Sequence, residues 1–247
     1  MKNTIKVKNL STSYYGQEAL HEINFSFDTG KLIGIIGPNG AGKSTLMKSM
    51  LGLIRKDAGD VSFAGMPLKQ ARKKIAYVPQ RATIDWDFPI IVLDAVLLGV
   101  YPKLGVFRRP RKADREWAYE CLRKVGMEDF SRKQIGELSG GQQQRVFLAR
   151  ALAQNADFFF LDEPLVGIDV TSEELIMTIL KNLRDEGKSI FVVHHDLTKV
   201  SDYFDDLILL NKKLIKSGTV ESVLQPEVMR EAYKAQFSLL DSMGVFS

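Results

Sequence analysis

One short stretch near the amino terminus carries the pattern of a phosphate-binding loop. The stretch Gly37-Pro-Asn-Gly-Ala-Gly-Lys-Ser44 fits G-x-x-x-x-G-K-[ST], between an apolar run and a helical pattern. Its glycines let backbone amides curl around phosphate oxygens, and the N-terminal end of the following helix favours the same negative charge. Lys43 is then placed to reach the β- and γ-phosphates of a nucleotide, and Ser44 to offer its hydroxyl to Mg²⁺. A glycine-rich turn with a chance lysine is the alternative, and the strand-loop-helix context argues against it. The predicted phosphate ligands are Gly37, Pro38, Asn39, Gly40, Ala41, Gly42, Lys43, Ser44 and Thr45.

Two adjacent carboxylates follow a second apolar run. Asp162 and Glu163 come directly after Phe158–Leu161, so they are expected at the carboxyl end of a buried strand, the ligand side of a parallel sheet. Asp162 would hold Mg²⁺, directly or through water. Glu163 would polarise the water that attacks a γ-phosphate. A solvated strand end is the alternative, and the phosphate loop upstream favours the catalytic interpretation.

A third motif is Leu138-Ser-Gly-Gly-Gln142. Ser139 is suited to cap the following helix, whose predicted range is 142–154. A capped helix start does not explain two glycines in a first turn, because glycine is a poor helix former. Glycines there would instead let an oxyanion approach the backbone. The predicted ligands are Ser139, Gly140, Gly141 and Gln142.

The elements that must position these residues alternate between strand and helix. Short apolar, β-branched runs predict buried strands, and longer helical patterns lie between them. This alternation indicates an α/β domain with a mainly parallel sheet. The strands are expected at 32–36, 75–78, 158–161, 190–193 and 207–210, and the helices at 43–53, 142–154 and 171–186.

Two stretches depart from this alternation. Residues 3–29 alternate in polarity and carry turn signals, which predicts an antiparallel β region. Residues 85–137 contain helical patterns at 93–98 and 114–125, which predicts a mostly helical subdomain inserted into a core of residues 1–84 and 138–247. The last 25 or so residues are also expected to be helical.

Composition narrows the classes of protein. The chain has 247 residues, enough for one large domain with its own core. The single cysteine, Cys121, excludes an intramolecular disulfide and suits a reducing compartment. A net charge of +4 is compatible with an anionic ligand and requires no nucleic acid as a partner. No apolar run reaches the length of a membrane span.

Taken together and in this order, the three motifs resemble those of the nucleotide-binding subunit of an ATP-binding cassette (ABC) transporter. The resemblance covers nearly the whole chain and implies a P-loop NTPase fold that binds ATP and Mg²⁺. It implies that Gln80 contacts Mg²⁺ and water, that Asp169 lies in a loop crossing a dimer, and that His195 lies near the γ-phosphate. It also places an aromatic residue on the adenine: Tyr14 from its spacing, with Tyr15 left open by a one-residue slip.

The resemblance also implies partners. In this family two ATPase subunits pair, and the loop Ser139–Gln142 of one caps the nucleotide bound by the other. A homodimer on the cytoplasmic face of the membrane is therefore expected, peripheral to integral permease subunits. The segment Gln80–Pro89 is similar to that of bacterial manganese, zinc and iron importers, most of all the manganese branch. This subgroup implies, indirectly, an extracytoplasmic metal-binding protein.

Alternatives remain for the transported solute and for the environment of several surface residues. An ABC ATPase for another solute, or for an exporter, carries the same motifs, as does a soluble ABC protein of DNA repair or translation. Trp86 and Phe88 are expected either as exposed aromatics for a permease helix or as packing within the helical subdomain. The basic turn Arg108–Lys112 is expected to face solvent. The alternative is that it contacts anionic lipid headgroups.

Overall fold

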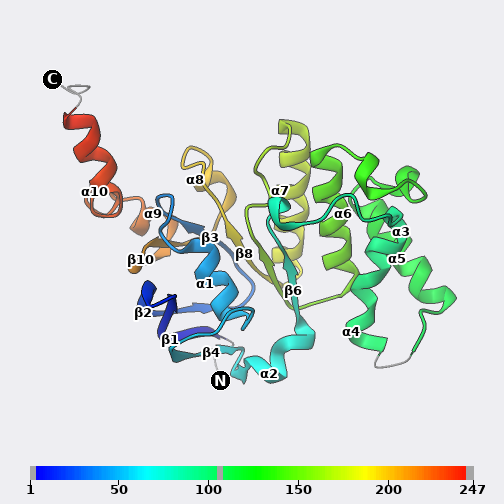
Figure 1. Ribbon diagram of the computed structural model, residues 1–247, viewed down its shortest axis with the longest axis horizontal. Coiled ribbons are helices and arrows are strands. Elements are labelled where there is room, and N and C mark those ends of the chain that lie inside the picture. The colour runs from blue at the N-terminus through cyan, green and yellow to red at the C-terminus, as the bar shows by residue number, and fades with distance from the viewer. Residues whose placement is uncertain (1–3, 105–107, 243–247) are drawn as a thin grey trace. The chain divides into compact units, whose positions relative to one another are not determined.

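In the computed structural model, residues 4–104 and 108–242 are described, and the chain divides into two compact units (Figure 1). The first unit contains residues 1–70 and 193–247, and the second contains residues 71–192. This division differs from the predicted helical subdomain at 85–137, whose bounds stay a prediction.

The first unit contains an antiparallel sheet in the order β2-β1-β4-β5. Alternating polarity sends every second side chain of its longer strands inward, and Val7 pairs with Phe25 on one side and with Val61 on the other. The predicted antiparallel region therefore exists, and it also recruits a later segment, β4. Its strands are β1 (Thr4–Tyr14), β2 (Gln17–Asp28), β4 (Ala58–Phe63) and β5 (Met66–Pro67).

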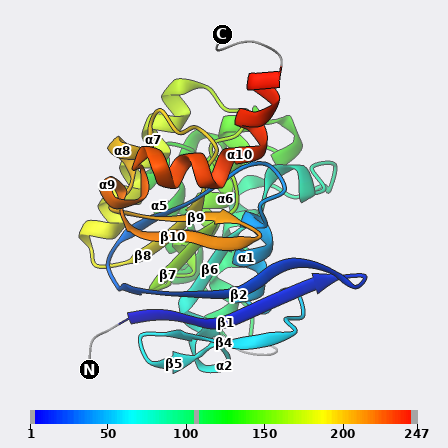
Figure 2. The ribbon, with the colours of Figure 1, turned by 90° about the vertical axis from the view of Figure 1, so that its left-hand side faces the viewer.

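The first unit also holds three strands in the order β10-β9-β3, with β3 parallel to β9 and β10 antiparallel to it. The strand β3 is buried along its whole length, as its continuous apolar sequence requires. The helix α10 packs on β9 and β10 (Figure 2). The elements are β3 (Leu32–Ile36), α1 (Lys43–Met50), α8 (Val200–Tyr203), β9 (Asp206–Asn211), β10 (Lys213–Thr219), α9 (Val220–Val223) and α10 (Pro226–Ser242).

The second unit contains the parallel strands β8-β7-β6. All of β7 and β8 is buried, and Phe160 stacks on Phe191 with their ring centroids 4.8 Å apart. The strands are β6 (Ile75–Val78), β7 (Phe158–Leu161) and β8 (Ser189–Val193), and the helix α7 (Val170–Asp185) follows β7. The short helix α2 (Leu68–Ala71) lies where the chain passes from the first unit to the second.

The described residues between β6 and β7 form helices and turns, as the sequence predicts. The helices α3, α5 and α6 contact one another. Gly99, in the 3₁₀ turn that follows α3, lets this turn approach α6 closely, because a Cβ there would lie 2.1 Å from the carbonyl oxygen of Arg150. The helices are α3 (Val92–Leu97), α4 (Tyr101–Leu104), α5 (Lys112–Lys124) and α6 (Gly140–Ala153), with 3₁₀ turns at Arg72–Lys74, Arg81–Thr83, Leu98–Val100, Glu128–Phe130 and Ile135–Glu137.

The expected mainly parallel α/β architecture is confirmed. The strands at 32–36, 75–78 and 158–161 have the predicted bounds, and the predicted helices begin and end within three residues of the observed ones. Three strands were not expected. β4 and β10 contain polar and charged residues, and β5 is only two residues long, so none of them forms a continuous apolar run. The predicted helical tail is α10 up to Ser242, and positions 243–247 lie outside the described residues.

Candidate functional site

The predicted phosphate loop connects β3 to α1. Gly37 has φ +146°, and a Cβ on it would lie 2.1 Å from the carbonyl oxygen of Leu210, so no larger residue fits. Lys43 begins α1 and is almost fully buried. Its Nζ donates to the carbonyls of Gly37 and Pro38 at 2.8 and 2.9 Å. The Lys43 ammonium group thus donates to carbonyls of the loop. The oxygens of a bound phosphate would accept from the same group.

The two predicted carboxylates lie directly beyond β7. Asp162 is fully buried, and the hydroxyl of Tyr77 donates to its Oδ2 at 3.4 Å. Burial, and after it the charge of Asp162, raises the pKa of Tyr77 well above its ordinary value, so this hydroxyl remains a donor. A buried carboxylate with oxygen neighbours is the kind of group that holds a hard cation.

Glu163 has an unusual backbone. Its φ is +54°, which is the left-handed region that non-glycine residues rarely adopt. Such a conformation costs roughly 1–2 kcal/mol and tends to persist where function requires it. The carboxylate Oε2 accepts a hydrogen bond from Gln80 Nε2 at 2.5 Å.

Strand register explains why Gln80 and Glu163 meet. Val78 pairs with Leu161 at the parallel ends of β6 and β7, and the amide of Asp162 donates to the Val78 carbonyl at 2.9 Å. Gln80 and Glu163 each lie two residues past this pair, on the same edge of the sheet. The structure therefore brings together two residues that the sequence singled out separately.

The third motif is a helix start closed by a capping box. Ser139 is the N-cap of α6, and its hydroxyl accepts from the amide of Gln142 at 3.4 Å. In return, Gln142 Oε1 accepts from the amide of Ser139 at 2.9 Å. This reciprocal pairing satisfies two backbone donors of the first turn. The predicted capping role of Ser139 is thus present in the structure.

The glycines of this motif have a reason within the protein that the sequence did not reveal. A Cβ on Gly141 would lie 2.6 Å from Ser172 Oγ and 3.0 Å from Asp169 Oδ2. Asp169 is the N-cap of α7 and accepts from the amide and hydroxyl of Ser172 at 2.9 and 2.8 Å. These bonds, first that from the Ser172 amide, lower the pKa of Asp169. Gly141 thus lets the starts of α6 and α7 touch.

The two adjacent histidines have different environments. His194 is buried, with ring centroids 5.5 Å from Phe204 and 5.9 Å from Tyr203. His195 is exposed and precedes a turn in which Asp196 accepts from the amide and hydroxyl of Thr198. A packed ring suits His194, and an accessible imidazole suits the role near the γ-phosphate that the family resemblance implies for His195.

The candidate adenine residues lie at the β1–β2 turn. Tyr14 ends β1 and pairs with Gln17, and its side chain is 41% exposed. Tyr15 is fully exposed, and with φ +51° it is followed by Gly16 at φ +78°, the pattern of a type I′ turn. Both side chains are accessible, so the choice of Tyr14 stays a prediction.

Arg81 was not singled out by the sequence, yet it connects several of these features. Its Nε donates to the buried Gln143 Oε1 at 3.0 Å, and its guanidinium carbon lies 3.1 Å from the position of a Cβ on Gly140. Gln143 Nε2 in turn donates to the Ile135 carbonyl at 3.2 Å. The sequence signal that could have found this contact is the run of three consecutive glutamines in the predicted helix. If one of them is buried, its side-chain amide requires a hydrogen-bond partner.

A largely apolar hollow of about 230 Å³ is lined by Trp86, Phe88, Phe147 and Arg150, among others. Trp86 packs edge-on against Phe147 at 5.2 Å and donates to the Arg81 carbonyl at 3.0 Å. Phe88, by contrast, is 59% exposed on the rim. Trp86 therefore packs within the protein, which was one of the two predicted alternatives, whereas Phe88 is an exposed aromatic, which was the other. The guanidinium of Arg150 lies 4.4 Å over the Phe147 ring in the same hollow, and burial lowers the pKa of Arg150.

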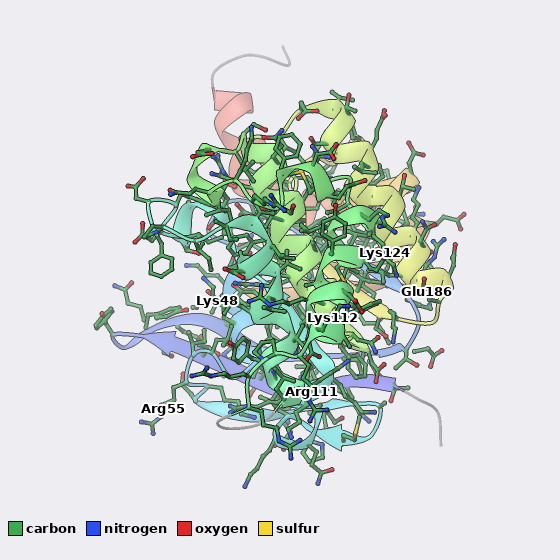
Figure 3. The ribbon with its side chains drawn as sticks, turned by 90° about the vertical axis from the view of Figure 1, so that its right-hand side faces the viewer. Lys48, Arg55, Arg111, Lys112, Lys124 and Glu186 are labelled. Carbon is green, nitrogen blue, oxygen red and sulfur yellow. The ribbon has the colours of Figure 1, made fainter. Side chains whose placement is uncertain are left out.

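The basic turn is exposed, as expected of a solvated face. Figure 3 shows Arg111 and Lys112 at one end of α5 and Lys124 at the other. The amide of Arg111 donates to Asp114 Oδ2 at 2.7 Å, which closes the start of the helix. A hollow of about 540 Å³ is lined by Lys103, Leu104, Arg108, Arg109, Arg111 and Asp114.

Comparison with known proteins establishes the class. Residues 20–166 match the family model of the ABC transporter. The fold, the phosphate loop and the carboxylate pair agree with this match. The chain belongs to the ABC transporter family, and it is an ATPase that binds ATP. No helix in the described ranges is long and apolar enough to cross a membrane.

Several relatives are similar over nearly their whole length. The manganese transport system ATP-binding protein MntB of Listeria innocua is 55% identical over 93% of this chain and 95% of its own. The protein of the same name from Halalkalibacterium halodurans is 53% identical over 99% of both chains. The zinc transport system ATP-binding protein TroB of Treponema pallidum is 47% identical over 95% of this chain and 88% of its own.

Solved structures agree with the fold. The dimeric post-hydrolysis state of an ATP-binding cassette bound to ADP and Pi has a TM-score of 0.78 at 29% identity, over 87% of this chain and 98% of that one. The cbiO1 protein from Clostridium perfringens, part of an ABC transporter complex, has a TM-score of 0.77 at 26% identity over 100% of both chains.

The packing at the start of α6 predicts different effects for its two glycines. Gly141→Ala should destabilise the protein by about 1–3 kcal/mol, because the new methyl group meets the fixed start of α7. Gly140→Ala is the matched control and should remain within about 0.5 kcal/mol of the parent, because only the flexible tip of Arg81 must move. Chemical denaturation measures both, and equal stabilities would contradict the close approach of α6 and α7.

Proposed function

We propose that the chain is the ATP-hydrolysing subunit of a bacterial ABC importer for divalent metal ions, with manganese as the cargo. The observation that carries the proposal is its near full-length identity, above 50%, with manganese transport ATP-binding proteins of two bacteria. A zinc relative at 47% identity makes zinc the second candidate. The cargo never touches an ATPase subunit, so its identity rests on these relatives.

The proposed cofactor is the Mg²⁺ of MgATP, which neutralises charge on the β- and γ-phosphates when bound. Ser44, Gln80 and Asp162 would be its protein ligands, directly or through water. Their donors are hydroxyl, amide and carboxylate oxygens, the set that Mg²⁺ prefers. The complete burial of Asp162 supports this role, because a buried carboxylate is stable when it faces a cation.

The proposed reaction is an in-line attack of water on the γ-phosphate of ATP. Glu163 orients the water and accepts its proton as the new oxygen–phosphorus bond forms, and the bond to the bridging oxygen breaks to release ADP. Gln80 holds the Glu163 carboxylate in place through its side-chain amide. Lys43 binds the β- and γ-phosphates, and His195 acts on the γ-phosphate as an accessible imidazole.

The proposed active form is a homodimer. The capped loop of Ser139, Gly140, Gly141 and Gln142 would bind the nucleotide held by the second copy, since the N-terminus of α6 favours negative charge there. Asp169, which caps α7 beside Gly141, would lie in the loop that crosses to that copy. ATP would then join the two surfaces, and its hydrolysis would release them.

The proposed membrane partner is an integral permease, docked at the hollow around Phe88. An exposed aromatic on the rim of an apolar hollow is suited to an apolar helix end. The half-buried guanidinium of Arg150 would meet the carbonyls or carboxylates of that helix. The chain would thus be peripheral on the cytoplasmic face, with an extracytoplasmic metal-binding protein delivering the ion from the other side.

Reconstitution with the permease tests the proposed transport. Uptake of Mn²⁺ into liposomes that hold the complex should depend on ATP, and Zn²⁺ and Fe²⁺ should compete less well. Lys43→Ala is the control, because losing its phosphate contacts should abolish both ATP binding and uptake. Uptake of none of the three ions by an ATP-hydrolysing complex would contradict metal import.

The permease contact predicts a separate effect of Phe88. Phe88→Ala should leave the ATPase rate and stability of the isolated subunit unchanged, because the side chain is 59% exposed. It should weaken binding to the permease at least tenfold, since an interface hot spot is worth about 2 kcal/mol or more. Leu53, which is 55% exposed in the first unit, provides the control Leu53→Ala. Equal permease affinity of the two variants would place the docking surface elsewhere.

A further inference from the structure

Arg81 is held against the start of α6 by contacts of both its backbone and its side chain. It lies in the 3₁₀ turn Arg81–Thr83, directly after Gln80. Its carbonyl accepts from Trp86 Nε1 at 3.0 Å, and its guanidinium carbon lies 5.7 Å from the centroid of the Trp86 ring. Its Nε donates to Gln143 Oε1 in α6 at 3.0 Å. The position of Arg81 is therefore set by contacts within the second unit.

The bond to Gln143 directs the cationic end of Arg81 toward the capped loop. Gln143 is 3% exposed, and its Nε2 donates to the Ile135 carbonyl at 3.2 Å. A buried amide oxygen needs a donor, and Arg81 supplies it through Nε. The other two nitrogens of the guanidinium, Nη1 and Nη2, then lie 3.2 and 3.4 Å from the position of a Cβ on Gly140. The positive charge of Arg81 thus lies against the backbone of this loop.

The charge of Arg81 matters because a carboxylate lies beside the same loop. Asp169 Oδ2 lies 3.0 Å from the position of a Cβ on Gly141. This negative charge would repel an anion that approaches the start of α6. The helix dipole, equivalent to roughly half an elementary charge, offsets it only in part. The first turn of α6 adds no acidic residue, so with the charge of Arg81 at Gly140 the start of α6 favours an anion.

We propose that Arg81 supplies the positive charge of the capped loop and strengthens its binding to the triphosphate that a second copy of the chain presents. This role rests on the proposed homodimer. A guanidinium suits it, because arginine is well matched to phosphate oxygens and its charge acts strongly where a closing interface excludes water. Loss of the charge should weaken the ATP-bound dimer. It should not affect ATP binding through Lys43, which lies in the first unit.

The variant Arg81→Gln tests the proposal in a Glu163→Gln background, where bound ATP is retained. Glutamine removes the charge and keeps an amide that can donate to Gln143. The dissociation constant of the dimer in MgATP, measured by sedimentation equilibrium, should rise about tenfold or more, because both sites lose a charge-assisted contact. The difference should shrink at high ionic strength, since salt screens charge. The ATP affinity of the monomer, measured below the concentration at which it dimerises, should not change.

Two further variants in the same background make the result specific to charge. Arg81→Lys keeps the positive charge, so it should recover most of the dimer affinity and its dependence on salt. Arg123→Gln is the matched control, because it removes an arginine of the same unit whose side chain is 57% exposed on α5. This control should leave the dissociation constant of the dimer unchanged.

The possible contrary results are distinct from one another. If Arg81→Gln dimerises as tightly as Glu163→Gln alone, the role of Arg81 is overturned and the homodimer stands. An equal loss in Arg81→Gln and Arg81→Lys that does not depend on salt would also overturn it, because it would show a purely structural role. If Glu163→Gln itself stays monomeric in MgATP, the proposed homodimer is wrong, and the role of Arg81 is wrong with it.

Discussion

The chain at Glu163 passes through left-handed backbone, and the proposed chemistry of the second unit depends on that constraint. The strand β7 is buried along its length, so its register against β6 cannot slip without exposing apolar side chains. The strand ends at Leu161, and the turn at φ +54° then sends the Glu163 carboxylate to Gln80. The strain is local, and the buried strand behind it holds the residue in place.

Close contacts between backbone segments also hold the phosphate loop and the loop before α6 in place. Gly37 rests on a carbonyl of β9 in one unit, and Gly141 rests on the start of α7 in the other. In each case a side chain as small as a methyl group would displace a neighbouring element. The phosphate loop and the capped loop before α6 are therefore shaped by contacts within the protein itself. Preorganised donors of this kind favour anion binding, because little reorganisation is needed when the ligand arrives.

Much of the fold could be predicted because its buried strands are continuous apolar runs. The strands β3, β6 and β7 have the bounds that this pattern predicts, and the capping role of Ser139 also followed from local sequence. The strands β4, β5 and β10 could not be found in this way, because none of them is a continuous apolar run. The links of Arg81 to Gln143, and of Lys212 to Ala41, join residues far apart in the chain, so no local pattern reports them. Gln80 and His195 were chosen through family resemblance, and strand register then supplied the physical reason for Gln80.

The catalytic role of Glu163 is most directly tested by Glu163→Gln. This change keeps the shape of the side chain and an oxygen that can accept from Gln80, but it removes the base. Steady-state ATP hydrolysis should fall by about 10²–10⁴-fold, the usual contribution of a general base. ATP affinity should be retained, and the variant should accumulate as an ATP-bound dimer in size-exclusion chromatography. Hydrolysis at the parental rate would contradict the assignment of Glu163 as the residue that activates water.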